Sequence, residues 1–160
     1  MYKKKCIELL EQRGVKLADI AECVCILQKK FIPDLTIEDA IEVVDNVLSK
    51  REVQHAVLTG INVDILSENH KLVSSELEDI LNNDYSLYGV DEVLAYGICN
   101  IYGSIALTNF GYVDRVKPGI IEKLNSHEGG KCHTFLDDIV GALAASAASR
   151  LAHSNGDKKE

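Results

Sequence analysis

Apolar residues recur with helical spacing along most of this chain, and no segment alternates between apolar and polar residues as a strand does. Helix-start signals punctuate the pattern, such as Thr36 three residues before Asp39. The pattern predicts helices over residues 2–13, 17–31, 36–49, 51–65, 76–81, 91–109, 119–124 and 134–153, with a turn-rich connection over 109–118 and a loop at 128–130. We therefore expect a compact all-α fold.

The last predicted helix is apolar on every side. No charged residue occurs between Ile139 and Ser149. Small side chains dominate this stretch, at Gly141, Ala142, Ala144, Ala145, Ala147 and Ala148. A helix without a polar face is a buried helix, and small side chains let neighbouring helices approach closely. We expect a single domain over residues 1–153 with this helix at its centre, followed by a disordered tail over 154–160.

Composition and charge narrow the class of protein. The 160 residues carry a net charge of −8, which argues against nucleic-acid binding because phosphate contacts need clustered Lys and Arg. The five cysteines lack zinc-ligand spacing and are typical of a reducing cytoplasm, and the charged N-terminus differs from a secretory signal. The uncharged stretch 93–113 is long enough to span a bilayer, but its polar and glycine residues indicate a buried helix instead.

Two predicted helices begin with acidic pairs, Asp91-Glu92 and Asp137-Asp138. Acidic residues cap free N–H groups at a helix start, and this explains Asp91 as an N-cap and Asp137 as the partner of Thr134 in a capping box. Glu92 and Asp138 are not explained in this way, because each lies on an apolar face of its helix. If the two helices pack side by side, all four carboxylates are candidate ligands of a hard cation such as Mg²⁺. Capping alone and a metal site both remain open at this point.

Cationic and polar residues near these helix starts suit a phosphate ester. Asn109, Arg115 and Lys117 in the predicted 109–118 connection, together with Arg51, are candidate phosphate-binding residues. His133 is a candidate proton donor to a leaving group. Each of these residues taken singly is also compatible with a solvated surface position.

The segment 137–141 has the sequence DDIVG, which resembles the acidic D-[DE]-x-V-G signature of the phosphatidylglycerophosphatase A family, Mg²⁺-dependent phosphatases of phospholipid synthesis. The whole chain is similar to short soluble members of that family from Gram-positive bacteria, through the segments KKFIPDLT, KREVQHAVLTGI, YGVDEVLA and FLDDIVGA. The resemblance implies that Asp137 and Asp138 are metal ligands, that Mg²⁺ is the cofactor, and that the reaction is the hydrolysis of a phosphate monoester in lipid metabolism.

We therefore expect a cytoplasmic hydrolase, without a transmembrane span, that acts on a phosphorylated small molecule or a lipid headgroup. Contact with the inner face of the membrane and homo-oligomerisation are left open. Asp138, Glu92 and His133 are the candidate catalytic residues. Two alternatives remain: a helical binding or oligomerisation module without catalytic activity, and an all-α nucleotide pyrophosphatase that would use Glu8, Glu11, Glu76 and Asp79.

Overall fold

The computed structural model describes residues 1–157, which form helices and no strands, and this confirms the all-α prediction. The helices are α1 (Lys3–Gln12), α2 (Leu17–Gln28), α3 (Ile37–Val47), α4 (Arg51–Glu68), α5 (Ser75–Asn82), α6 (Val90–Cys99), α7 (Ser104–Val116), α8 (Ile120–Asn125) and α9 (Leu136–Asp157), with a 3₁₀ turn, η1 (Glu128–Gly130). The predicted loop at 128–130 thus contains this single turn. Residues 158–160 lie outside the described part of the chain.

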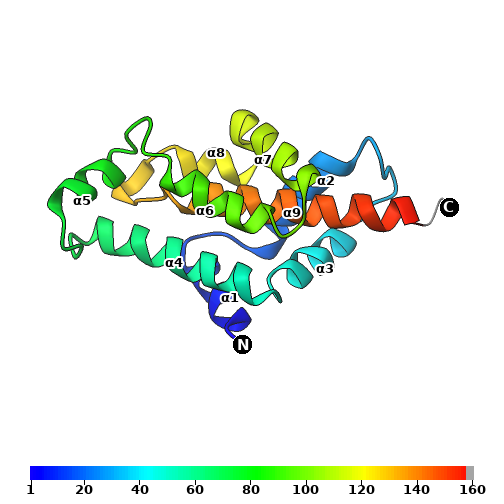
Figure 1. The fold of residues 1–160 in the computed structure, drawn as a ribbon, viewed down its shortest axis with the longest axis horizontal. Coiled ribbons are helices and arrows are strands. Elements are labelled where there is room, and N and C mark those ends of the chain that lie inside the picture. Colours follow the sequence, from blue (N-terminus) through cyan, green and yellow to red (C-terminus); the bar gives the residue numbers. More distant parts are fainter. Residues whose placement is uncertain (158–160) are drawn as a thin grey trace.

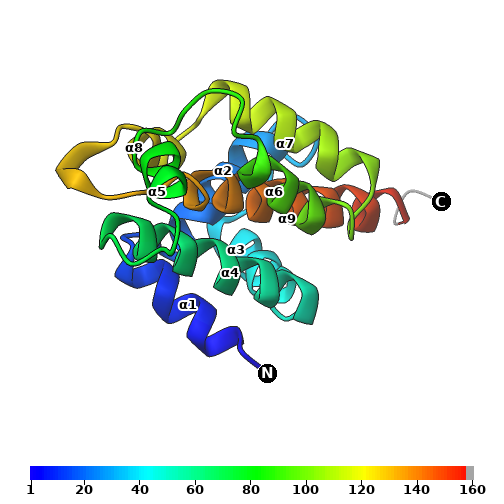
Figure 2. The same cartoon turned by 60° about the vertical axis from the view of Figure 1, so that its left-hand side comes forward.

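Helix α9 is the axis of the molecule. Every residue from Leu136 to Ser149 is buried, and helices α2, α3, α4, α6, α7 and α8 all pack against it (Figures 1 and 2). Its small side chains permit close contact, since a Cβ added at Gly141 would lie 3.4 Å from Phe110 and Val113 of α7. Gly60 likewise lets α4 approach α9 closely, because a Cβ there would overlap Ile139 of α9. The predicted buried central helix is confirmed.

Local sequence signals account for several helix starts. Thr36 accepts a hydrogen bond from the Asp39 N–H at 3.1 Å while the Asp39 side chain accepts one from the Thr36 N–H, which completes the predicted capping box of α3. Ser74 caps α5 by accepting from the Leu77 N–H at 3.1 Å. These caps satisfy backbone donors that the first helical turn leaves unpaired.

The predicted helix over residues 91–109 and the connection that follows it are wrong. The first helix ends at Cys99, with Asn100 as its C-cap. A new helix, α7, begins after Gly103, whose φ of +88° is a conformation that favours glycine. The freed carbonyl of Tyr102 accepts a hydrogen bond from Ser149 of α9 at 3.0 Å. The sequence gives no sign of this helix end, because α6 and α7 both bury apolar faces on α9 and no charged residue separates them. Residues 109–116 are therefore the second half of α7, which ends at Val116 with Lys117 as its C-cap, before Pro118.

Helix α9 also continues to Asp157, so residues 154–157 are helical rather than part of the predicted disordered tail. The remainder of that predicted tail, 158–160, lies outside the described residues. Within residues 1–157, no helix combines the length and the hydropathy that crossing a bilayer requires.

Candidate metal centre

The first turn of α6 directs two acidic side chains towards α9. Gly89 precedes this helix with a φ of +71°, so it reverses the chain at little conformational cost. The predicted N-cap role of Asp91 is wrong, because Gly89 takes that position and Asp91 lies inside the first turn. The Asp91 carboxylate instead accepts a hydrogen bond from the N–H of the next residue, Glu92, at 3.0 Å.

The first turn of α9 is held by a residue that is distant in sequence. The carboxylate of Asp64, about one turn before the end of α4, accepts hydrogen bonds from the N–H groups of Phe135 at 3.0 Å and Leu136 at 2.9 Å. The predicted capping box of Thr134 and Asp137 is therefore wrong. The Thr134 hydroxyl donates to the carbonyl of Leu81 at 2.6 Å, away from the free N–H groups of α9.

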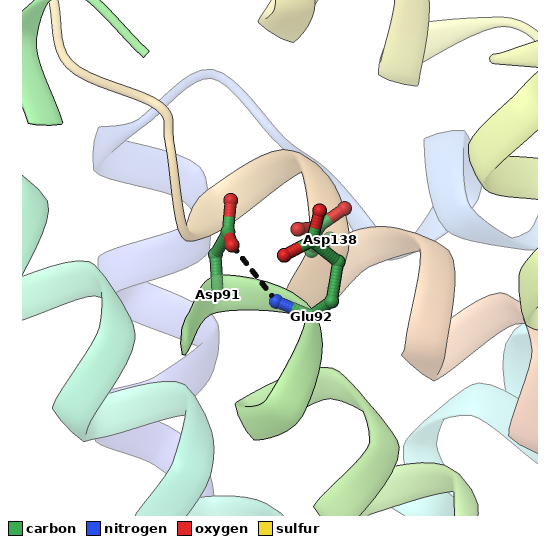
Figure 3. A group of neighbouring side chains, drawn as sticks. All are labelled: Asp91, Glu92 and Asp138. Carbon is green, nitrogen blue, oxygen red and sulfur yellow. Dashed lines mark hydrogen bonds between the residues drawn. The ribbon is translucent and has the colours of Figure 1, made fainter. Parts of the chain in front are cut away.

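These two helix starts bring three carboxylates together. One oxygen each from Asp91, Glu92 and Asp138 lies within 4.8 Å of the others, and Figure 3 shows the side chains from α6 and α9 converging. Asp91 and Asp138 are only 6% and 5% exposed. The Glu92 Oε2 atom is buried, and no residue between 1 and 157 donates a hydrogen bond to it. The arrangement confirms the proximity of Glu92 and Asp138 that the sequence suggested.

The electrostatics of this group favour a bound cation. Burial, followed by the charge of the neighbouring Asp137, raises the pKa of Asp138 far above its ordinary value. Burial also raises the pKa of Asp91, and Glu92 adds to that shift. Carboxylates this close are costly to ionise together unless a positive charge lies between them. Hard oxygen ligands and an unpartnered buried oxygen fit Mg²⁺ well.

A polar cavity of about 280 Å³ opens beside the three carboxylates. Lys117, at the end of α7, lines it, and its ammonium group donates to Asp114 at 3.0 Å and to Asp137 at 3.4 Å. Asp137 is thus a cavity residue paired with a lysine, and it lies outside the three-carboxylate group. Asn125 of α8 also faces the cavity.

Three of the four residues expected to bind phosphate lie outside this cavity. Arg51, the first residue of α4, and Arg115 of α7 are exposed, and neither lines it. Asn109 is half-buried in α7 and also does not line it. Of the predicted phosphate-binding residues, the structure brings only Lys117 to the acidic group.

The position of His133 does not support the predicted role as a proton donor. Its Nδ1 atom lies 3.3 Å from the guanidinium of Arg13, on the side of α9 where Glu68 lies, and it does not line the acidic cavity. Burial and the Arg13 charge lower the pKa of His133 to about 4. The ring is therefore neutral near pH 7 and holds no acidic proton for a leaving group.

The structure adds cavity residues that the sequence did not single out as site residues. These are Asp84 and Tyr88, from the segment before α6; Asp114 of α7, which the sequence already placed near Lys117 in the predicted 109–118 connection, lines the cavity as well. The i,i+3 spacing of Asp114 and Lys117 on a helix is a signal for their pairing, but it becomes usable only once this segment is known to be helical. Asp84 and Tyr88 carry no such signal, because a chain reversal brings them to the cavity.

These features define an all-α protein in which three carboxylates converge where the first turns of two core helices meet. Residues 9–153 match the family model of Phosphatidylglycerophosphatase A, which covers most of the chain. The chain therefore belongs to the phosphatidylglycerophosphatase A family.

Relatives in this family are similar over nearly their whole length. The uncharacterized protein YutG of Bacillus subtilis is 60% identical over 90% of this chain and 86% of its own. YpjQ of the same organism is 50% identical over 96% of this chain and 85% of its own. The crystal structure of the low temperature requirement C protein from Listeria monocytogenes matches with a TM-score of 0.93 and 54% identity, covering 98% of both chains. These relatives are consistent with the fold described above.

Proposed function

We propose that this protein is a Mg²⁺-dependent phosphatase that hydrolyses a phosphate monoester, with phosphatidylglycerophosphate as the substrate typical of its family. Family membership suggests phosphatase-type activity. The observation that carries the proposal is the convergence of Asp91, Glu92 and Asp138, whose oxygens lie within 4.8 Å of one another at the wall of a polar cavity. The unpartnered Oε2 atom of Glu92 supports a cation at this place.

In this proposal Asp91, Glu92 and Asp138 hold Mg²⁺. When bound, Mg²⁺ neutralises phosphate oxygens and makes water a better nucleophile. Lys117 supplies a second positive charge, because an ammonium group has three donors and only two of them are used by Asp114 and Asp137. The third donor is free for a phosphate oxygen of the substrate.

The carboxylates also offer a proton acceptor. Glu92, with a free Oε2, is either the third ligand or the base that takes a proton from the attacking water. Water adds to phosphorus while this base takes its proton, the bond from phosphorus to the alcohol oxygen breaks, and the proton passes to the departing alkoxide to give inorganic phosphate and the free alcohol.

The direct test is a phosphatase screen with phospholipid, sugar and nucleotide phosphates, in the presence of Mg²⁺, Mn²⁺ or a chelator. We expect phosphate release that requires the metal, and a loss of about 10²-fold or more in kcat/KM for Asp138→Asn. Asp34→Asn, which changes an exposed carboxylate, is the matched control and should keep full activity. Equal activity of Asp138→Asn and the control would contradict the proposal.

The two alternatives make different predictions in the same screen. A helical binding module would release no phosphate and would not respond to Mg²⁺. A nucleotide pyrophosphatase would release pyrophosphate from nucleoside triphosphates, but its four candidate carboxylates are placed poorly for shared metal binding. Within residues 1–157 they form no metal-like group, and Glu11, Glu76 and Asp79 are exposed.

We also propose a cytoplasmic location, with contact at the inner face of the membrane when the substrate is a lipid. The described cysteines are all free, which is the usual state of thiols in a reducing compartment. Homo-oligomerisation stays a prediction that sedimentation of the purified protein tests.

A further inference from the structure

A second cavity lies in the groove between α4 and α6, which run alongside each other (Figure 1) and both pack against α9. We call it the α4–α6 groove; its volume is about 620 Å³. Ala56 and Val63 of α4 line one wall, Val93 and Leu94 of α6 line the other, and Phe135 also contributes to the lining. Its size falls within the range of about 300–1,000 Å³ that is usual for small-molecule sites. In contrast to the acidic cavity, this groove is mainly apolar.

The α4–α6 groove adjoins the acidic cavity. Tyr88 lines both spaces, and its ring packs edge-on against Phe135 with the ring centres 6.0 Å apart. The first turns of α6 also serve both spaces, because Asp91 and Glu92 face the acidic cavity while Val93 faces the groove. A molecule that occupies both spaces must be charged at one end and apolar at the other.

The apolar residues of the groove leave surface that a ligand would cover. Val90 is 51% exposed and Val93 is 65% exposed, although both lie on a core helix. Exposed apolar surface beside a polar site is typical of ligand-binding grooves.

We infer that the α4–α6 groove binds one apolar chain of the substrate, whose phosphate group occupies the acidic cavity. This inference rests on the proposed function and adds to it a binding site for the hydrocarbon chain of an amphiphilic phosphate monoester. The groove contributes affinity for the chain, while the carboxylates and Lys117 act on the phosphate. Chain length therefore controls binding through residues that take no part in the chemistry.

Gly97 provides a specific test. It is exposed in α6 and lines the groove, and a Cβ added there meets no atom of residues 1–157 within 4 Å. Gly97→Leu therefore places a side chain in the groove without disturbing the core. Gly111→Leu is the matched control, because Gly111 is also an exposed helical glycine with open space, on α7 and outside the groove. Both changes replace glycine inside a helix and favour the helix equally.

The probes are octylphosphonate and methylphosphonate, which resemble the substrate but cannot be hydrolysed as esters. Calorimetric titration with Mg²⁺ present should show tighter binding of octylphosphonate to the wild type. Gly97→Leu should weaken octylphosphonate at least about tenfold and leave methylphosphonate unchanged, while Gly111→Leu should change neither. Val93→Thr, which makes the groove polar at nearly constant volume, should weaken octylphosphonate in the same direction.

Several outcomes would overturn the inference. These are equal affinity of the wild type for both probes, unchanged octylphosphonate binding in both groove variants, and a change in oligomeric state caused by Gly97→Leu, which would make the groove an interface between copies. Failure of the proposed function has a different signature. If no phosphate ester is hydrolysed while octylphosphonate still binds in a Gly97-dependent manner, the groove site stands and the phosphatase activity is rejected.

Discussion

Two groups of buried carboxylates flank the first turn of α9, and they differ in whether their oxygens have partners. On one side, Asp64 accepts two backbone N–H groups of α9. Next to it, Glu68 accepts two hydrogen bonds from Arg13 at 2.7 and 2.8 Å and one from the N–H of Cys132 at 2.8 Å. Each of these carboxylates therefore fixes the position of another segment.

On the other side, Asp91, Glu92 and Asp138 face one another. Asp91 accepts a hydrogen bond only from the adjacent backbone N–H, and Glu92 keeps a buried oxygen without a donor in the described chain. A polar group buried without a partner costs stability, so this arrangement is unfavourable for the protein alone. The comparison teaches that burial alone does not identify a functional carboxylate. The second group differs from the first in having a buried carboxylate oxygen without a donor in the described chain.

The largest effect on stability should come from Asp64, in the group whose carboxylates have hydrogen-bond partners. Asp64→Ala leaves the N–H groups of Phe135 and Leu136 buried without an acceptor, at about 1–3 kcal/mol each. We expect the free energy of unfolding to fall by about 2–6 kcal/mol in urea titrations with chelator present. Glu42→Ala, which removes an exposed carboxylate of α3, is the control and should have a small effect. A loss from Asp64→Ala no larger than the control would contradict the structural role.

A smaller effect on stability should come from Lys117, which lines the acidic cavity. Lys117→Met removes the donor to Asp114 and Asp137 but keeps the length of the side chain and the same left-handed backbone position. We expect a loss of about 1.5–3 kcal/mol with chelator present, the range for hydrogen bonds to charged groups. Thermal unfolding measures it. If Lys117→Met is as stable as the wild type, the lysine does not neutralise this cavity.

The dependence of stability on pH should show that the pKa of Asp138 is raised in the folded protein. Burial and the Asp137 charge raise the folded-state pKa of Asp138 above its ordinary value of 3.8. The folded protein then binds more protons than the unfolded chain above about pH 4, so stability falls as pH rises. With chelator present, the free energy of unfolding of Asp138→Asn should rise relative to that of the wild type as pH increases from about 4 to about 8. A difference that stays constant over this range would contradict the raised pKa.

The smallest effect should come from His133. It is neutral near pH 7 and lies beside Arg13, away from the acidic cavity. His133→Gln should therefore change stability by less than about 1 kcal/mol and leave any phosphatase kcat unaltered. Unfolding and steady-state assays of the same preparation measure both. A large loss of kcat with unchanged stability would restore the hypothesis that His133 is the proton donor.

The sequence was informative where a feature depends on nearby residues. Helical periodicity and the Thr36 capping box are local, and the small-residue stretch of α9 allows no exposed face, so these predictions are confirmed. The convergence of Glu92 and Asp138 was also predictable, because both begin helices that run directly into the core. That inference needed only the assumption that two apolar helices pack side by side.

The sequence was uninformative where partners are distant. Asp64 lies within a helical pattern, and nothing near it indicates that it caps a helix more than seventy residues later in the chain. Thr134 satisfied the local rule for a cap, but its hydroxyl bonds to Leu81 instead. The break at Gly103 was missed because the residues on both sides are uncharged and buried on the same helix. Tertiary contacts decided each of these cases.

The central claim is that Asp91, Glu92 and Asp138 form a cation site. The most direct measurement is a thermal-unfolding titration with Mg²⁺ of the wild type, Asp138→Asn and the control Asp34→Asn. We predict that Mg²⁺ at about 100 times its Kd stabilises the wild type and the control by about 2.7 kcal/mol. Asp138→Asn should be at least as stable as the wild type without Mg²⁺ and should show no response to it. Stabilisation of Asp138→Asn equal to that of the wild type, or no stabilisation of any of the three, would contradict the claim.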